Sequence, residues 1–226
     1  QMAYIRNNSL HLFVLPGLVC SLLGDGRDIP QRHLQRLVRL LYPFFRSEYF
    51  LHWREDGELD QAVEQILGVL TDQGLIQREG EVVRSAPLHT LESDLLAHLG
   101  QTVAQALERY YLTIRILVQH GNARLDADTL EELAHLTAQR LSLLYEFNSP
   151  EFFDRAVLRN FIHQLQVYKL VTRNDDNMLC FDERLQAMDD EARRILSPDL
   201  RQGIVRLTRL CETRQQNSAV QAEDAP

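Results

Sequence analysis

A histidine and an aspartate near the middle of the chain have the spacing of a catalytic pair. His89 and Asp94 form an H-x-x-x-x-D pattern, in which an aspartate can orient a histidine that takes a proton from a hydroxyl group. The pattern lies where a helix is expected to begin, and helical residues five positions apart do not face each other. No glycine- or arginine-rich anion-binding element follows it. We therefore interpret the pair as coincidental and expect His89 to be structural or to face solvent.

The remaining histidines, serines and cysteines do not form a recognisable active site. The other seven histidines do not show the spacing of a metal-binding motif. The sequence has no G-x-S-x-G nucleophile motif, no P-loop and no G-x-G-x-x-G motif. Cys20, Cys180 and Cys211 are far apart and lack C-x-x-C spacing, which favours a reducing compartment. We expect neither a metal nor a cofactor in this chain, and no self-sufficient active site.

A basic stripe lies in the first quarter of the chain. Arg32, Arg36 and Arg39 recur at i, i+4 and i+7 and so share one face of a helix. Basic side chains beside apolar ones suit contact with an anionic membrane surface or an acidic carrier protein, and each exposed charge contributes on the order of 1 kcal/mol at a lipid surface. The alternative is an ordinary solvated helix face. The aromatic stretch at residues 41–53 is expected to be core rather than a membrane-contacting patch.

A third polar group precedes the most apolar stretch of the chain, residues 12–23. Arg6, Asn7 and Asn8, with Tyr4 just before them, combine a guanidinium group with two amides. Beside a seam between domains they could line a phosphate or polyol pocket, since arginine binds phosphate oxygens in a fork geometry. Alternatively, an asparagine caps or flanks a helix and Arg6 pairs with a surface acid. Composition leaves both interpretations open.

Charge is uneven along the chain and restricts its partners. Residues 1–54 carry seven arginines against three acidic residues, a net charge of +4, whereas the remainder carries 17 basic against 29 acidic residues, a net charge of −12. Nucleic acid is therefore not expected as a partner, because binding phosphate backbones needs a dominant basic surface. The longest apolar run, residues 12–20, is shorter than the roughly 20 residues that span a bilayer. We expect neither a membrane span nor an export signal.

The elements that position these groups are mostly helices. Pro16 is expected to kink or divide the first one. Asp28 is predicted to cap the second with Pro30 in its first turn, Pro43 to begin the third, and Gly100 to be a weak point in a long helix. We expect, in order, helices over residues 3–23, 30–41, 41–53 and 59–70, a hairpin at about 75–84, helices over 88–120, 126–145 and 150–168, a hairpin at about 170–182, and helices over 182–196 and from 197.

A helix followed by a hairpin occurs twice, at residues 59–84 and 150–182, which is the outline of a winged-helix unit. The predicted fold class is mainly α, a helical domain with one or two small β-hairpins in winged-helix-like units. Because chain ends are usually polar, the apolar opening stretch is expected to join a domain upstream. We divide the chain into a junction helix, two helical units and a disordered tail, at residues 1–23, 24–120, 121–214 and 215–226.

Several short runs in this sequence resemble one protein family, in order along nearly the whole chain. The first is Tyr4-x-Arg6-Asn7-Asn8-x-x-His11-x-x-Val14-Leu15-Pro16-x-Leu18. The others are Leu41-Tyr42-Pro43, Glu48-x-Phe50-Leu51-x-Trp53, Gln73-Gly74-Leu75-Ile76, Leu107-Glu108-Arg109-Tyr110, Ala138-Gln139-Arg140-Leu141-Ser142-x-Leu144 and Ser149-Pro150-Glu151-Phe152-Phe153-Asp154-x-Ala156-Val157. They are similar to the region that follows the catalytic domain in bacterial membrane-associated glycerol-3-phosphate acyltransferases.

The resemblance implies a role in phospholipid biosynthesis for the parent protein. Such a parent transfers a fatty acyl group from acyl-carrier protein or acyl-coenzyme A to the 1-hydroxyl of glycerol 3-phosphate, on the cytoplasmic face of the inner membrane. In the family the catalytic His-Asp pair and the phosphate-binding motifs lie upstream of the Tyr-Arg-Asn-Asn segment, so they are absent here. The resemblance thus implies a domain that binds and positions rather than catalyses. From the apolar first helix and the net charge of +4 in residues 1–54, we infer that it supports the upstream acyltransferase domain and helps to dock it on an acidic membrane or carrier protein. It makes Tyr4, Arg6, Asn7 and Asn8 candidates for residues beside the substrate pocket.

A different class of function is also compatible with the sequence. Two helix-plus-hairpin units could form a free-standing winged-helix-like interaction module with a regulatory role. The acidic balance disfavours nucleic acid as the partner of such a module. An upstream reading frame encoding an H-x-x-x-x-D motif would discriminate the two classes in favour of the acyltransferase.

Overall fold

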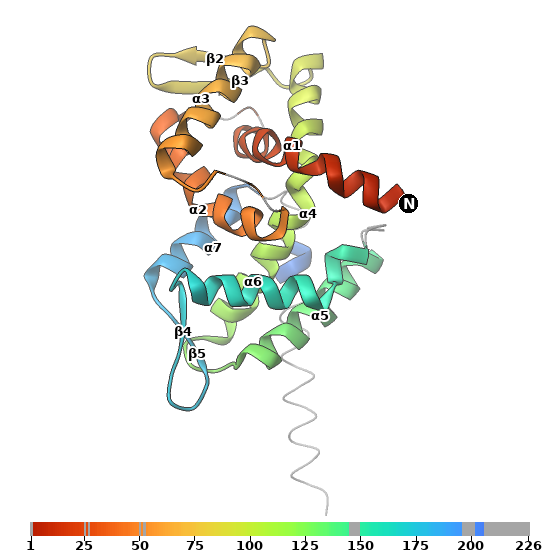
Figure 1. Ribbon diagram of the computed structural model, residues 1–226, viewed down its shortest axis with the longest axis vertical. Helices are drawn as coiled ribbons and strands as arrows, with labels where there is room; N and C mark the ends of the chain where they lie inside the picture. The colour runs from red at the N-terminus through yellow and green to blue at the C-terminus, as the bar shows by residue number, and fades with distance from the viewer. Residues whose placement is uncertain are drawn as a thin grey trace, which may run out of the picture. The chain divides into compact units, whose positions relative to one another are not determined.

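The computed structural model describes residues 2–24, 26, 28–49, 51, 53–144, 150–195 and 202–205, and of residues 2–10, 150 and 193–195 it describes the backbone alone. The fold is mainly α with two small antiparallel sheets, as predicted (Figure 1). The elements are α1 (Met2–Leu23), β1 (Asp28–Pro30), α2 (Gln31–Tyr49), α3 (Asp56–Asp72), β2 (Ile76–Glu79), β3 (Val82–Ser85), α4 (Leu91–His120), α5 (Ala127–Leu144), the 3-10 helix η1 (Pro150–Phe153), α6 (Arg155–Val167), β4 (Val171–Arg173), β5 (Leu179–Phe181) and α7 (Glu183–Ile195).

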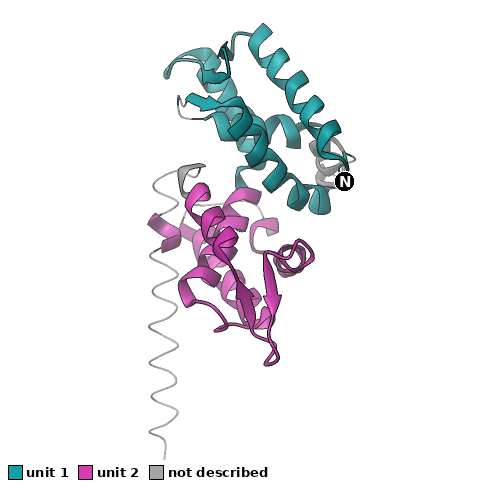
Figure 2. Ribbon diagram, turned by 90° about the vertical axis from the view of Figure 1, so that its left-hand side faces the viewer, with its two compact units in different colours: residues 1–105 teal, residues 106–226 magenta. Residues whose placement is uncertain are grey.

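The chain divides into two compact units, residues 1–105 and 106–226, so that the division falls inside α4 (Figure 2). The division into a junction helix, two units meeting near residue 120 and a tail remains a prediction about domains. Its last part, residues 215–226, lies outside the described residues.

Unit 1 has the connectivity of a winged helix. Its elements follow the order helix, strand, helix, helix, strand, strand, and its sheet has the strand order β1-β3-β2. The hairpin predicted at residues 75–84 is confirmed as β2 and β3, paired antiparallel with Ile76 opposite Ser85. Helix α1 packs against α2 and α3, and α3 packs against β2. The buried side chains of these helices form the core, among them Leu15, Leu18, Leu34, Phe45 and Leu67.

The prediction that Asp28 and Pro30 begin a helix is wrong. They belong to β1, which pairs antiparallel with β3 and places Ile29 opposite Val83, both of them buried. Proline is compatible with this strand because β1 lies at the edge of the sheet, where one side of the backbone has no ladder partner. A three-residue strand is too short to show the alternation of buried and exposed side chains that identifies a strand. The aspartate and proline therefore predicted a helix start instead.

Two prolines lie inside continuous helices. The predicted boundary at Pro43 is wrong, because α2 runs without interruption from Gln31 to Tyr49. Pro16 likewise lies inside α1. A proline in a helix interior costs about 3 kcal/mol, and burial of the surrounding side chains offsets that cost. Phe44 and Phe45 next to Pro43 are both almost fully buried.

Unit 2 repeats the helix-and-hairpin pattern. Helix α5 is capped by Asp126, whose Oδ1 accepts a hydrogen bond from the Thr129 N–H at 2.7 Å. The helix predicted from residue 150 to 168 is instead divided into η1 and α6. Asp154 makes this break, because its carboxylate accepts from the Ala156 N–H at 2.7 Å and caps α6. The predicted cap at Ser149 lies outside the described residues, and the second predicted hairpin is confirmed as β4 and β5.

Helices α1 and α4 cross at two glycines. A Cβ on Gly17 would collide with the Thr102 hydroxyl and lie 3.0 Å from the Leu99 carbonyl oxygen. A Cβ on Gly100 would lie 3.1 Å from Cα and 3.2 Å from the backbone nitrogen of Ser21. Gly100 is therefore a packing position and not only a weak point of the helix, because a Cβ there would force the Ser21 backbone to move by a few tenths of an ångström.

Gly17→Ala and Gly100→Ala are expected to destabilise the protein by about 1–3 kcal/mol each, because the added methyl group overpacks a backbone contact. Thermal or urea unfolding measures the change. The matched control is Gly68→Ala inside α3, where a Cβ meets nothing within 4 Å. This control should stabilise by about 0.5–1 kcal/mol through helix propensity. Equal effects at all three glycines would contradict the assignment of the crossing.

Candidate functional site

The predicted basic stripe lies on α2, and acidic residues from other elements bind part of it. We call Arg32, Arg36 and Arg39 the basic face. Arg32 is highly exposed and its Nη2 lies 3.0 Å from Glu81 Oε1, in the turn between β2 and β3. Arg39 donates from Nε to Asp60 Oδ1 on α3 at 2.9 Å and from Nη2 to the other carboxylate oxygen. The hydrogen bond with Asp60 raises the pKa of Arg39 above its usual value, so this guanidinium group stays charged at any physiological pH.

Arg36 differs from its two neighbours on the basic face. Its Nη2 lies 2.9 Å from His33 Nδ1, one turn earlier in α2. Arg36 is exposed, and an exposed guanidinium group retains most of its attraction for anions when its partner is an imidazole rather than a carboxylate. The three arginines therefore form a surface of mixed charge in which Arg36 is the position best suited to an anionic partner.

The aromatic stretch after the basic face contributes mainly to the core. Tyr42, Phe44 and Phe45 are almost fully buried. The Tyr42 and Trp53 rings lie 6.1 Å apart between centroids, and Trp53 offers its backbone carbonyl to Arg46 Nη1 at 3.5 Å. These contacts match the prediction of core residues rather than a membrane-contacting patch.

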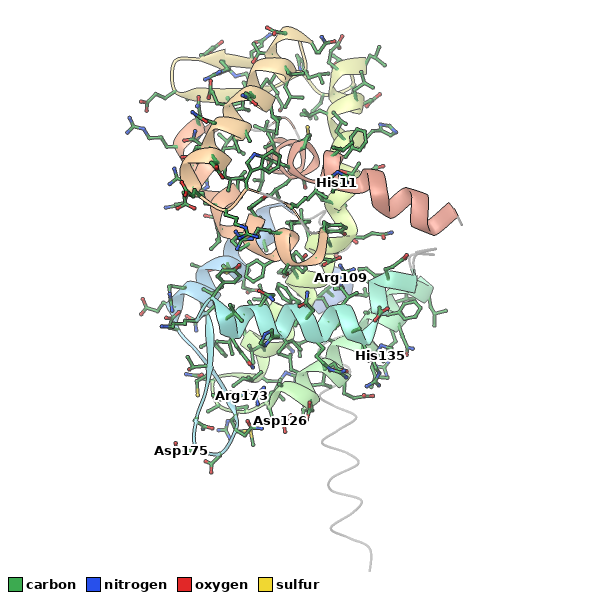
Figure 3. The ribbon with its side chains drawn as sticks, in the orientation of Figure 1. His11, Arg109, Asp126, His135, Arg173 and Asp175 are labelled. Carbon is green, nitrogen blue, oxygen red and sulfur yellow. The ribbon has the colours of Figure 1, made fainter. Side chains whose placement is uncertain are left out.

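The predicted pocket residues Tyr4, Arg6, Asn7 and Asn8 lie on the first turns of α1. Their backbone is helical, but their side chains lie outside the described part of the chain, so their role remains a prediction. The next residues along α1 are exposed, namely His11, labelled in Figure 3, and then Leu12 and Phe13. From Val14 onward almost every side chain of α1 is buried.

His89 and Asp94 have structural positions at the start of α4. His89 lies in the turn before the helix, exposed and with a φ of 66°. The following residue, Thr90, forms a reciprocal capping box with Ser93, with bonds of 3.1 and 3.2 Å. No hydrogen bond joins His89 to Asp94 among the described residues, and no group of three potential metal ligands occurs among them. His98, one turn after Asp94, contacts the Asp94 backbone carbonyl through Nδ1 at 2.6 Å.

A buried arginine and a histidine on unit 2 hold the 3-10 helix η1. Arg109 is 2% exposed, and its Nη1 donates to the Glu151 carbonyl oxygen at 3.2 Å. His135 on α5 donates from Nδ1 to the Phe153 carbonyl oxygen at 2.6 Å (Figure 3). These bonds satisfy carbonyl groups of a single helical turn, which has few internal partners of its own. Two of the runs that resemble the acyltransferase family thus meet in a structural contact.

Glu108 on α4 is a half-buried carboxyl group that is not among the predicted site residues. Its Oε2 is buried and has no hydrogen-bond partner among the described residues. Burial raises the pKa of this carboxyl group to about 7, although the nearby charge of Arg109 opposes the shift. Two turns further along α4, Arg115 forms an ion pair with Asp189 on α7 at 3.1 Å, and Asp189 is almost fully buried. The sequence signal was an adjacent glutamate and arginine between apolar residues, Ala106 and Leu107 before them and Tyr110 to Leu112 after them.

Cys20 does not resemble a catalytic nucleophile. Cys20 is buried in α1, and burial raises the pKa of its thiol to about 12. A thiol with so high a pKa is protonated and unreactive at neutral pH.

Within the described ranges, none of the helices combines the length and the apolar character that crossing a bilayer requires.

Comparison with known proteins identifies relatives of one kind. Residues 1–174 match a family model described as the glycerol-3-phosphate acyltransferase C-terminal region. A protein of Pseudomonas entomophila named glycerol-3-phosphate acyltransferase is 38% identical over 205 residues, which cover 90% of this chain and 24% of that protein. Proteins of the same name are 35% identical in Pseudomonas paraeruginosa, over 98% of this chain and 26% of the relative, and 38% identical in Xanthomonas campestris, over 92% and 24%.

The chain therefore spans about a quarter of the length of the relatives it matches. No solved structure matches it.

Glu108→Gln is expected to change the pH dependence of stability. In the wild-type protein the unfolded carboxyl group loses its proton near pH 4.5 and the folded one near pH 7. The unfolded state therefore binds fewer protons between these values, and stability falls as the pH rises through that window, by on the order of 1–3 kcal/mol. Glutamine removes this loss, so the variant should gain stability relative to wild type between pH 5 and 7.5.

Urea unfolding at several pH values measures this effect. The matched control is Glu58→Gln on α3, at an exposed carboxylate, where the change should stay within about 0.5 kcal/mol. A stability difference between Glu108→Gln and wild type that does not vary with pH would contradict the burial of this group.

Proposed function

This chain belongs to the family of glycerol-3-phosphate acyltransferase C-terminal regions, and we propose from this that it is the non-catalytic C-terminal domain of a glycerol-3-phosphate acyltransferase. The observation that carries the proposal is the family match over residues 1–174, most of the chain. The relatives are about four times as long as the matched region. The proposal assigns the acyl transfer to the part of the parent protein that this chain does not include.

The geometry of the described residues supports a non-catalytic role. His89 lies beside a helix cap, and His98 and His135 contact backbone carbonyl groups through Nδ1. Catalysis by a nucleophile requires a base within hydrogen-bond reach and a group that orients the base. Among the described side chains, none of His89, His98 and His135 has both a nucleophile and an orienting carboxylate as hydrogen-bond partners. The polar groups of this chain instead cap helices, join helices and fix backbone turns.

In the proposed parent, the upstream acyltransferase domain transfers a fatty acyl group to the 1-hydroxyl of glycerol 3-phosphate. The donor is acyl-carrier protein or acyl-coenzyme A, and the reaction belongs to phospholipid biosynthesis. We place the parent on the cytoplasmic face of the bacterial inner membrane as a peripheral protein. Tyr4, Arg6, Asn7 and Asn8 are proposed to lie beside the substrate pocket, because they precede the buried part of α1 and belong to the run that, in the family it resembles, follows the catalytic domain.

We also propose that the basic face of α2 helps to dock the parent at an anionic membrane surface. Arg32, Arg36 and Arg39 are all exposed, and residues 1–54 carry a net charge of +4. The ion pairs of Arg32 with Glu81 and of Arg39 with Asp60 weaken the attraction that these two positions exert. Arg36 therefore provides most of the affinity. The same charge would serve an acidic carrier protein.

Duplex nucleic acid fits the winged-helix connectivity less well. In winged-helix and helix-turn-helix proteins that bind DNA, the helix before the hairpin enters the major groove and must tolerate nearby phosphates. In unit 1 that helix is α3, which carries five acidic residues and no Lys or Arg. This distribution disfavours the alternative of a DNA-binding module.

The isolated 226-residue chain is expected to show no acyl transfer to glycerol 3-phosphate above background. The reason is that the proposed catalytic machinery lies upstream. The measurement is an assay with labelled glycerol 3-phosphate and a long-chain acyl-coenzyme A, in parallel with the parent protein and with circular dichroism to establish that the chain is folded. Turnover by the folded chain alone would contradict the non-catalytic assignment.

Arg36→Ala is expected to weaken binding of the parent protein to vesicles that contain phosphatidylglycerol by about fivefold, since each exposed basic residue contributes on the order of 1 kcal/mol. The matched control is the double variant Arg39→Ala/Asp60→Ala, which removes both members of an ion pair and leaves the net charge unchanged, so that binding should change by less than twofold. Vesicle sedimentation at low salt measures both. Unchanged binding of the Arg36→Ala variant would refute docking through this face.

A further inference from the structure

The two units share the same backbone features at a constant spacing. Gly26, with a φ of 69°, lies 95 residues before Gly121, with a φ of 90°. Gly74, with a φ of 70°, lies 95 residues before Lys169, with a φ of 54°. A non-glycine residue with positive φ is uncommon, so the left-handed conformation of Lys169 at this position indicates a matching chain path.

The helices that precede the hairpins end in the same way. At the end of α3 the Leu75 N–H donates to the Leu70 carbonyl oxygen at 2.9 Å, and at the end of α6 the Leu170 N–H donates to the Leu165 carbonyl oxygen at 3.0 Å. A second bond, three residues in span, accompanies each of them. This pair of bonds is the Schellman motif. Both helices therefore end with the same backbone geometry, from which the chain continues into the hairpin.

A counterpart of β1 also exists in unit 2. The Ala123 N–H donates to the Leu179 carbonyl oxygen at 3.0 Å, and the Leu179 N–H donates to the Leu125 carbonyl oxygen at 2.7 Å. Both polar backbone groups of Leu179 thus bind the segment 123–125, so that segment lies on the edge of β5 that β4 does not occupy. Its position before α5 corresponds to that of β1 before α2.

The repeat assigns two roles to α4. Unit 1 begins with α1 and ends, after its hairpin, with the first half of α4. Unit 2 begins with the second half of α4 and has α7 after its hairpin. The first and last helices are in contact in both units, at Gly17 and Leu99 in unit 1 and at Arg115 and Asp189 in unit 2. Helix α4 is therefore the last helix of one repeat and the first helix of the next.

Helix α1 corresponds to the second half of α4, but its described side chains before Val14 are exposed. The spacing of 95 residues places Leu12 in register with Leu107, which is 6% exposed, whereas Leu12 is 64% exposed. The neighbouring Phe13 is 47% exposed. Figure 1 shows the first turns of α1, in red, extending away from α2 and α3. We call residues 2–13 the α1 arm.

We propose that the α1 arm is an interaction surface that packs, through Leu12 and Phe13, against the upstream region of the same polypeptide. This proposal rests on the proposed function, which places three quarters of the protein upstream. The relatives supply the length of chain needed, since this chain spans only about a quarter of each. By analogy with α4, the arm serves the preceding part of the protein while residues 14–23 serve unit 1.

The test compares two surface sites, Leu12 and Val69, in the full-length parent. Val69 on α3 is 61% exposed, nearly the same as Leu12, so this chain by itself would expose both equally. Leu12→Cys and Val69→Cys variants are treated with a maleimide, and peptide-level mass spectrometry measures the labelling rate at each site in native and in urea-unfolded protein.

For each site we compare the labelling rate in unfolded protein with the rate in native protein. We expect this ratio to be at least tenfold larger at residue 12 than at residue 69. Equal protection at the two sites would overturn the proposal. Protection at residue 12 that disappears on dilution would also overturn it, because it would assign the surface to a second copy of the protein. Hydrogen exchange of the arm in the unmodified parent gives the same comparison if a cysteine variant does not fold, with slow exchange expected and fast exchange contradicting the proposal.

Failure of the proposed function is distinguishable from failure of this inference. An assay of the same parent preparation reports whether it transfers acyl groups to glycerol 3-phosphate. If the parent shows no acyl transfer, the ratio of labelling rates still tests whether the α1 arm is covered. If the two sites are labelled equally, the measured acyl transfer still stands.

Discussion

The crossing of α1 and α4 is the contact on which unit 1 depends. At this point two glycines bring helix backbones together, so that the Leu99 carbonyl group lies against Gly17 and the Ser21 backbone against Gly100. At Gly100 the nearest atoms are all backbone, whereas at Gly17 the Thr102 hydroxyl and the Val103 side chain also fill the space. Close packing of this kind leaves little room for a larger residue. Helix α4 continues from this crossing into unit 2, where Arg115 binds Asp189 of α7. One helix thus contributes the central contact of each repeat.

The described polar side chains make structural contacts. Such contacts are consistent with a domain that supports a catalytic domain rather than carrying out the reaction itself. Arg109 and His135 fix the carbonyl groups of η1, and Arg159 binds the buried Glu131 with bonds of 2.7 and 2.9 Å. Truncating Arg159 would leave the buried Glu131 carboxylate with only the more distant Arg155, at 3.8 Å, which is costly. The presence of Arg109 in a run that resembles the family therefore has a structural explanation and does not require a catalytic role.

The sequence predicted the elements with strong local signals and missed those decided by distant contacts. Both hairpins were recognised, since each lies between a helix end and a clear turn. The strand β1 was missed because three residues show no period, and the continuity of α2 through Pro43 depends on burial of Phe44 and Phe45. The basic face was placed correctly on one helix, but its partners Asp60 and Glu81 lie 21 and 49 residues away in sequence. Burial of Glu108 likewise follows from packing, which no local pattern reveals.

The most direct test of the account is a structure of the full-length protein with glycerol 3-phosphate bound. The account predicts that the substrate and the catalytic His-Asp pair lie in the upstream domain and that no side chain from Val14 onward contacts the substrate. Side chains of the α1 arm are the part of this chain expected beside the pocket. Glycerol 3-phosphate bound to His89 and Asp94, or within either compact unit, would contradict the central claim that this chain is a non-catalytic domain.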